Sequence, residues 1–150
     1  MVRINVQDVN DNAPKFTKSF YSFDILEDTD IDTTVGSIRA YDPDEGENGR
    51  VAYSLTSGWG NDTFSLDAEK GTFTLLRLLD FEENQLYTVQ VNAYDFGNPA
   101  QTSSVLVYFN VKDTNDNTPV FEQGIYDVAI LENVTVGTSI VQVQAPDVDT

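Results

Sequence analysis

Acidic and amide side chains recur at short spacing in this chain, and their oxygens are the ligands that calcium prefers in proteins. The segments Asp8–Asn12 and Asp113–Asn117 each offer carboxylate, amide and backbone carbonyl oxygens within five residues. Calcium takes about six to eight such oxygens at roughly 2.3–2.6 Å. Asn and Asp also crowd ordinary turns, because their side chains bond nearby backbone groups. One such segment alone therefore leaves a turn-only interpretation open.

The two segments belong to an internal repeat with an offset of 105 residues. The same offset superposes distant aromatic and acidic residues, and a proline follows each segment two residues later. The matched pairs are Phe16 and Phe121, Tyr21 and Tyr126, Glu27 and Glu132, Asp42 and Asp147, and Asp44 and Asp149. Repetition together with these distant partners argues against the turn-only interpretation.

The charge of the chain excludes several classes of function. It holds 25 Asp and Glu against 8 Lys and Arg, so its net charge is −17 and it would repel nucleic acid and anionic membrane surfaces. It contains no His and no Cys, which excludes histidine catalysis and disulfides. No apolar run approaches the length of a membrane span, and no signal peptide begins the sequence, so we expect any membrane anchor to lie outside this fragment.

The elements that position these side chains are predicted to be strands. Alternating or short apolar runs rich in Val, Thr, Tyr and Phe are broken by Gly, Asn, Asp and Pro. We expect strands at 19–26, 34–41, 50–56, 63–67, 72–77, 85–95 and 102–112. Seven strands in about 100 residues without a helical stretch predict an all-β fold, a seven-stranded Greek-key β-sandwich of the immunoglobulin-like kind.

The acidic segments also predict the domain boundaries, since the proline after each of them blocks both helix and ladder. We expect residues 1–12 to be the last strand and linker of a preceding repeat. Residues 13–117 would form one complete repeat with its linker. Residues 118–150 would supply the first two strands of a following, truncated repeat.

These motifs resemble the extracellular repeats of the cadherin family over essentially the whole chain. The matching stretches are Leu26-Glu27, Asp42-Pro-Asp44, the run 47–55, Leu79-Asp-Phe-Glu82, Ala93-Tyr-Asp95 and the two linkers. The resemblance implies an interior repeat of a multi-repeat ectodomain, with three calcium ions between consecutive repeats. Phe81 departs from the Arg or Tyr that many members carry between the two acids.

The resemblance also implies the ligands. At the upstream junction these would be Asp8, Asn10, Asp11, the Asn12 carbonyl, Asp42, Asp44, the Asn48 carbonyl and Asp95. At the downstream junction they would be Glu27, Asp80, Glu82, Asp113, Asn115, Asp116, the carbonyls of Thr114 and Asn117, Asp147 and Asp149. These carboxylates account for 12 of the 25 acidic residues.

The function that the resemblance implies is calcium-dependent cell–cell adhesion, in which ions at the linkers rigidify an extracellular ectodomain of a plasma-membrane protein. Partners would be other cadherin ectodomains and neighbouring repeats, not nucleic acid. The alternative is a cadherin-like module of a bacterial or matrix protein that binds carbohydrate, which an exposed aromatic platform on one sheet face would favour. An enzyme using Asp80 and Glu82 as acid and base is disfavoured, because no second group of candidate catalytic residues and no substrate groove accompany the pair.

Two further patterns remain. The run Asp28-Thr-Asp30-Ile-Asp32 begins like an EF-hand loop, but it lacks the Gly at position six and the Glu at position twelve, so we expect a solvated loop. The triplets at Asn61 and Asn133 are N-glycosylation acceptors if the protein is secreted. A glycan on Asn133 would have to point away from Glu132.

Overall fold

The computed structural model describes residues 1–60 and 62–149 of the chain. The chain divides into two compact units, Met1–Lys112 and Asp113–Thr150, called here the first and second units. Nine strands and no helix are assigned in the described ranges, so those ranges contain no helix long and apolar enough to cross a membrane.

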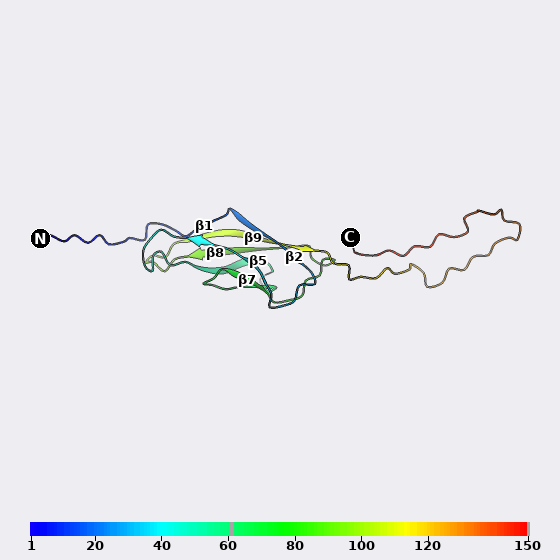
Figure 1. Cartoon of the computed structure of the whole chain (residues 1–150), viewed down its shortest axis with the longest axis horizontal. Coiled ribbons are helices and arrows are strands. Elements are labelled where there is room, and N and C mark those ends of the chain that lie inside the picture. The colour runs from blue at the N-terminus through cyan, green and yellow to red at the C-terminus, as the bar shows by residue number, and fades with distance from the viewer. Residues whose placement is uncertain (61, 150) are drawn as a thin grey trace. The chain divides into compact units, whose positions relative to one another are not determined.

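All nine strands lie in the first unit (Figure 1). They are β1 (Lys15–Phe16), β2 (Phe20–Leu26), β3 (Thr34–Ser37), β4 (Ala40–Tyr41), β5 (Ala52–Trp59), β6 (Phe64–Leu66), β7 (Thr72–Leu75), β8 (Leu86–Tyr94) and β9 (Thr102–Lys112). Their order is β2-β9-β8-β5 in a four-stranded sheet and β3-β7-β6 in a three-stranded sheet, while β1 pairs with β4. The predicted all-β sandwich is confirmed.

The core lies between the two larger sheets. Alternate residues of β8 and β9 are buried, as expected for strands with one face on a core. The Phe109 ring from the four-stranded sheet stacks at 4.0 Å on Phe64 and meets Phe73 edge-on at 5.1 Å, both from the three-stranded sheet. All three side chains have 0% exposure, so they join the sheets into one hydrophobic core.

The pairing of the strands places the two predicted ligand groups at opposite ends of the first unit. Strand β2 runs parallel to β9, so both strands end at the same edge, where the Glu27 N–H donates to the Lys112 carbonyl at 3.1 Å. Strand β8 runs antiparallel to β9. Asp95, which follows β8, therefore lies beside the start of β9, and its N–H donates to the Gln101 carbonyl at 3.1 Å.

The predicted strand at 34–41 is wrong in one respect, because the chain forms two strands there. Residues of β3 pair with β7, with a register shift between Thr34 and Gly36, whereas β4 pairs with β1. Between them the Tyr21 hydroxyl accepts from the Arg39 N–H at 3.2 Å and donates to the Arg39 carbonyl at 2.8 Å. These bonds hold Arg39 out of a continuous ladder. The other predicted strands agree with the observed ones to within three residues at each end.

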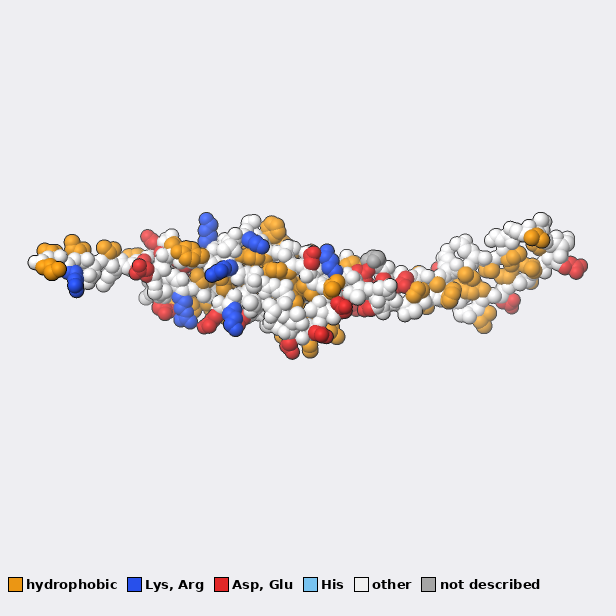
Figure 2. All heavy atoms as spheres, in the orientation of Figure 1, with side chains coloured by type: hydrophobic (Ala, Val, Ile, Leu, Met, Phe, Trp, Pro, Cys, Tyr) orange, Lys and Arg blue, Asp and Glu red, His pale blue; other side chains and the backbone are white. Residues whose placement is uncertain are grey.

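The second unit does not form the two strands that the sequence predicts. No strand is assigned in residues 113–149, and only two backbone bonds pair its arms, from the N–H of Val120 to Pro146 and of Glu122 to Gln144, each at 3.1 Å. Figure 2 shows hydrophobic side chains on the surface of this segment. The side chain of Ile125, for example, is 82% exposed. Two arms without a covering sheet have too little apolar contact to form a stable ladder.

Candidate metal centres

The carboxylate of Asp95 is fixed through one oxygen and leaves the other unmatched. Its Oδ1 accepts from Asn10 Nδ2 at 3.1 Å and from the N–H groups of Gly97 and Gln101, each at 3.0 Å. Its Oδ2 is buried and has no hydrogen-bond partner among the described residues. Asp95 is 1% exposed, so an unmatched oxygen there is costly unless a water or a cation reaches it.

The side-chain amide of Asn10 is also bonded through only one of its two polar atoms. Its Nδ2 donates to Asp95 Oδ1 and, at 2.8 Å, to the Pro99 carbonyl, while its own backbone carbonyl accepts from Gln101 Nε2 at 2.8 Å. Its buried Oδ1 has no partner in the described part of the chain. The hydrogen bonds therefore use the amide nitrogen and leave the amide oxygen available.

The carboxylate of Asp42, like that of Asp95, is bonded through only one of its two oxygens. It is 4% exposed, its Oδ1 accepts from the Asp44 N–H at 3.0 Å, and its Oδ2 has no described partner. Burial raises the pKa of the Asp42 carboxyl, and the hydrogen bond from Asp44 opposes that shift. The negative charges of Asp44, Asp95 and Asp8 raise the pKa of Asp42 further, as expected for neighbouring carboxylates.

The first linker lies directly on the loop that follows β4. Asp8 Oδ2 accepts from the Glu45 N–H at 3.1 Å and from Asn48 Nδ2 at 2.9 Å. Asn12 donates to Asp44 through its N–H at 3.1 Å and through Nδ2 at 2.6 Å. Asn12 Nδ2 also donates to Asp11 Oδ1, its neighbour, at 2.7 Å. The structure thus brings all eight predicted residues to this end of the first unit. Asn12 and Asn48 make these contacts through N–H groups, whereas the resemblance implies their carbonyls as ligands.

We call these eight residues the upstream cluster. Its unmatched oxygens are one amide and two carboxylate oxygens, the donor types that fit calcium and suit softer metals poorly. The chemistry of the donors and their burial therefore fit the ion that the sequence resemblance implies.

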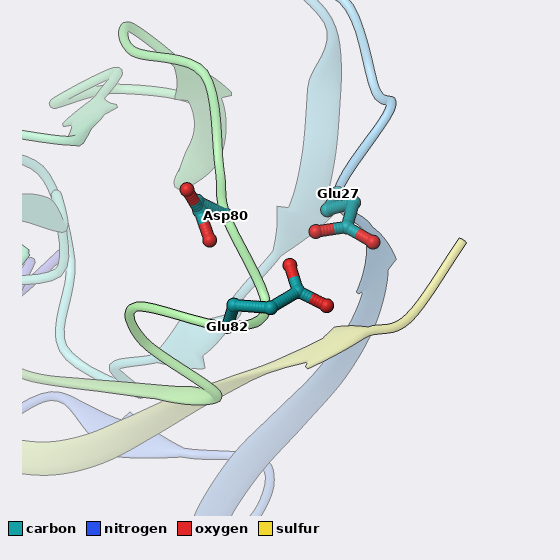
Figure 3. Close-up of side chains that lie close together, drawn as sticks. All are labelled: Glu27, Asp80 and Glu82. Atoms are coloured by element: carbon teal, nitrogen blue, oxygen red, sulfur yellow. The ribbon is translucent and has the colours of Figure 1, made fainter. Parts of the chain in front are cut away.

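A second group of carboxylates lies at the other end of the first unit. Oxygens of Glu27, Asp80 and Glu82 all lie within 4.8 Å of one another, and Figure 3 shows the Glu82 and Glu27 carboxylates facing each other. Glu27 is buried, whereas Asp80 and Glu82 are exposed. Three like charges this close repel, and a divalent cation would offset that repulsion. We call this group the downstream carboxylates.

Local hydrogen bonds hold the downstream carboxylates in place. Glu27 Oε2 accepts from the Phe81 N–H at 2.7 Å, which fixes the loop between β7 and β8 against the end of β2. Asp80 accepts from Glu83 N–H through Oδ1 and from Asn84 N–H through its carbonyl, each at 2.9 Å, forming a turn. That turn places Asp80 and Glu82 on the side of the loop that faces Glu27.

The second unit repeats the linker geometry of the first. Asn117 donates to Asp149 through its N–H at 3.1 Å and through Nδ2 at 2.6 Å, the distances found between Asn12 and Asp44. Asp149 N–H donates to Asp147 Oδ1 at 3.3 Å. Asn117 Nδ2 also donates to Asp116 at 2.8 Å, and Asp113, Thr114 and Asn115 precede it in the same linker.

The remaining sequence predictions are placed as follows. Asp28, Asp30 and Asp32 are exposed and belong to neither described group of converging carboxylates, as expected for a solvated loop. Asn133 is exposed, and its glycosylation stays a prediction. Asn61 lies outside the described residues.

Sequence reasoning missed three residues that hold the upstream cluster together. Gly97, Pro99 and Gln101 bond to Asp95 or Asn10 from the loop between β8 and β9. The signal available was the compact run Asp95-Phe-Gly-Asn-Pro99, which predicts a tight turn directly after a candidate ligand.

Comparison with known proteins identifies similar sequences over the whole chain. A sequence profile of the Cadherin domain matches residues 21–112. The chain is 40% identical over 148 residues to Protocadherin Fat 4 of Homo sapiens, and 43% identical over 148 residues to Cadherin EGF LAG seven-pass G-type receptor fmi-1 of Caenorhabditis elegans. Each match covers 99% of this chain but only 3% and 6% of those proteins, so the chain spans a small part of these curated relatives.

Solved structures are similar as well. The crystal structure of mouse cadherin-23 EC22-24 matches with a TM-score of 0.87 at 35% identity, over 93% of this chain and 45% of that one. The protocadherin gammaB7 EC3-6 cis-dimer structure matches with a TM-score of 0.86 at 29% identity, over 98% of this chain and 38% of that one.

Proposed function

Since the chain belongs to the cadherin family, we propose that it is a segment of a calcium-dependent cell–cell adhesion protein, in an extracellular ectodomain. In this proposal residues 13–117 are one cadherin repeat with its linker, residues 1–12 end the preceding repeat and residues 118–150 begin the next. Its partners are other cadherin ectodomains, and one similar solved structure is described as a cis-dimer. Its role is binding, not catalysis.

One observation carries the proposal. Asn10 Oδ1, Asp42 Oδ2 and Asp95 Oδ2 are buried oxygens without a described hydrogen-bond partner, and the other polar atoms of the same three side chains are bonded to protein. Protein interiors rarely leave several such oxygens unmatched in one place. In such a site the oxygens that accept no hydrogen bond can coordinate a cation.

The proposed ligands are those that the sequence resemblance implies. In the first unit they are the upstream cluster and the downstream carboxylates. In the second unit they are Asp113, Asn115, Asp116, Asp147, Asp149 and the carbonyls of Thr114 and Asn117. Bound calcium would supply the positive charge that lets these oxygens stay close together.

Hydrogen bonds within the chain hold the first linker against two loops of the first unit. Asp8 and Asn12 attach the first linker to the 44–48 loop, while Asn10 attaches it to the 95–101 loop. A linker held at both loops has lost most of its backbone freedom. Neutralising the remaining carboxylates would then make the joint between repeats rigid, which is the proposed contribution to adhesion.

Among the side chains that the structure describes, those of the four-stranded sheet give the carbohydrate-binding alternative no support. Phe20, which is 56% exposed, meets Tyr108 with an interplanar angle of 72°. Sugar rings stack on flat, exposed aromatic faces, and two rings at this angle do not form such a platform.

Calcium titration of the chain labelled with ¹⁵N-phenylalanine tests the proposal at both ends of the first unit. The Phe96 N–H donates to the Glu47 carbonyl at 3.0 Å next to Asp95, and the Phe81 N–H donates to Glu27 at 2.7 Å. We expect both amide signals to shift with saturation at roughly 10⁻⁴–10⁻³ M calcium.

The exposed-loop variant Asp28→Ala is the matched control and should titrate as the unmodified chain does. Magnesium at the same concentration should shift the two signals less, because it demands a tighter octahedral geometry. Phe96 and Phe81 signals that stay in place up to tens of millimolar calcium would refute the proposed function.

A further inference from the structure

The backbone at Gly97 passes unusually close to the side chain of Asn10. A Cβ atom at Gly97 would lie 2.1 Å from Asn10 Nδ2, 2.6 Å from Asn10 Cγ and 2.8 Å from Asn48 Oδ1. Gly97 is not among the residues with positive φ, so a left-handed backbone is not the reason for glycine here. The close approach to Asn10 is the observed feature that favours glycine here.

Asn10 cannot move away from Gly97 at low cost. Three hydrogen bonds hold it, namely those from its Nδ2 to Asp95 Oδ1 and the Pro99 carbonyl and that from Gln101 Nε2 to its own carbonyl. A Cβ that displaced the amide would break at least one of the bonds made by Nδ2. The buried Asp95 carboxylate would then lose part of its hydrogen-bonding environment, which is costly at 1% exposure.

The direction of the Asn10 amide follows from the same contacts. Because Nδ2 is bonded to the 95–101 loop, Oδ1 is turned to the other side of the amide group and remains without a described partner. Rotating or shifting the amide would therefore move the oxygen that the upstream cluster offers to a cation. The orientation of the Asn10 amide therefore depends on the close approach of the backbone at Gly97.

We propose that Gly97 is a positioning residue of the upstream cluster, since its lack of a side chain lets Asn10 press against the 95–101 loop with Oδ1 directed for cation binding. This inference rests on the proposed function. In this inference Gly97 does not bind the ion itself. It acts because it has no side chain that would displace Asn10. Gly49 is a poorer probe of this idea, because a Cβ there would lie 1.9 Å from the backbone oxygen of Asp44.

The first test is Gly97→Ala in the full chain. We expect calcium affinity reported by Phe96 to fall about tenfold, in the range found when groups behind metal ligands are lost, while the affinity reported by Phe81 stays unchanged. The matched control is Gly36→Ala, whose Cβ would meet the Phe23 ring at 2.8 Å. That variant should lower stability without changing calcium affinity at Phe96. Equal affinities for Gly97→Ala and the unmodified chain would overturn the inference.

A double-mutant cycle isolates the contact with Asn10. In the Asn10→Ala background the two atoms nearest the new Cβ are gone and only Asn48 Oδ1, at 2.8 Å, remains in its way. Gly97→Ala should then change the Phe96 affinity by less than about threefold. A loss as large as that in the unmodified background would assign the effect to the backbone or to Asn48, and would overturn the inference.

A metal-free measurement separates this inference from the proposed function. With calcium chelated, the side-chain amide protons of Asn10 should show the shifts and slow exchange of bonded groups in the unmodified chain. In Gly97→Ala they should move to the positions of a solvated amide. Unchanged Asn10 signals in Gly97→Ala would overturn the positioning role, whereas an unmodified chain whose Phe96 signal ignores calcium would refute the proposed function.

Discussion

Replacing Phe109 by alanine should lower the free energy of unfolding of the first unit by about 3–5 kcal/mol. The ring has 0% exposure and lies within 4.0–5.7 Å of the rings of Phe64, Phe73 and Phe23, measured between centroids. Its removal leaves a cavity between the two larger sheets, which are held apart by the remaining aromatic rings. The loss of buried apolar contact and the cavity both act against folding.

Denaturant unfolding followed by circular dichroism measures this effect, and Phe20→Ala provides a control of the same chemistry. The Phe20 ring is 56% exposed on the outer face of β2, so its loss should cost less than about 1 kcal/mol. Similar losses for the two variants would contradict the position of the core between the sheets.

Replacing Asp42 by asparagine should have opposite effects with and without calcium. Without calcium the buried carboxylate is disfavoured by burial and by the charges of Asp44, Asp95 and Asp8, so its removal should leave stability equal or higher. With calcium the variant should bind roughly 10–100-fold more weakly at the upstream cluster, because it loses a charged ligand. The sign of the stability change therefore depends on the ion.

The pH dependence of the metal-free chain gives a second measurement. Because the pKa of Asp42 is raised in the folded state, the folded protein binds the Asp42 proton more tightly than the unfolded chain does. The free energy of unfolding therefore falls as pH rises from the ordinary aspartate pKa through the raised pKa of Asp42. Asp42→Asn should lack this part of the fall. The control Asp28→Asn, in the exposed loop, should keep it. A calcium-free Asp42→Asn chain that is less stable than the unmodified chain at neutral pH would contradict this account.

The repeat offset predicted the linker geometry well, because the same residue types recur at the same spacing in both linkers. Asn12 and Asp44 are 32 residues apart, and the equivalent Asn117 and Asp149 show the same two hydrogen-bond distances. The aromatic pairs Phe16 with Tyr21 and Phe121 with Tyr126 have the same centroid distance of 6.4 Å. The linker motif forms even where no sheet surrounds it.

Features that depend on single side-chain contacts outside the repeated motifs could not be predicted in this way. The break between β3 and β4 is fixed by the hydroxyls of Tyr21 and Tyr53, the second of which accepts from the Ala40 N–H at 2.8 Å. Nothing in the apolar pattern of 34–41 marks that position. The same holds for Gln101, whose bond to the Asn10 carbonyl joins residues 91 positions apart.

The parallel pairing of β2 with β9 has a consequence for how the first unit bears mechanical load. The seven paired positions from Phe20 with Leu106 to Leu26 with Lys112 join the first long strand directly to the last. In a parallel pair, tension applied before β2 and after β9 pulls the two strands along each other, so all the ladder bonds are loaded together. An antiparallel pair pulled at one end would open one bond at a time. The first unit is thus connected for loading in shear, the geometry in which a β-ladder resists extension best.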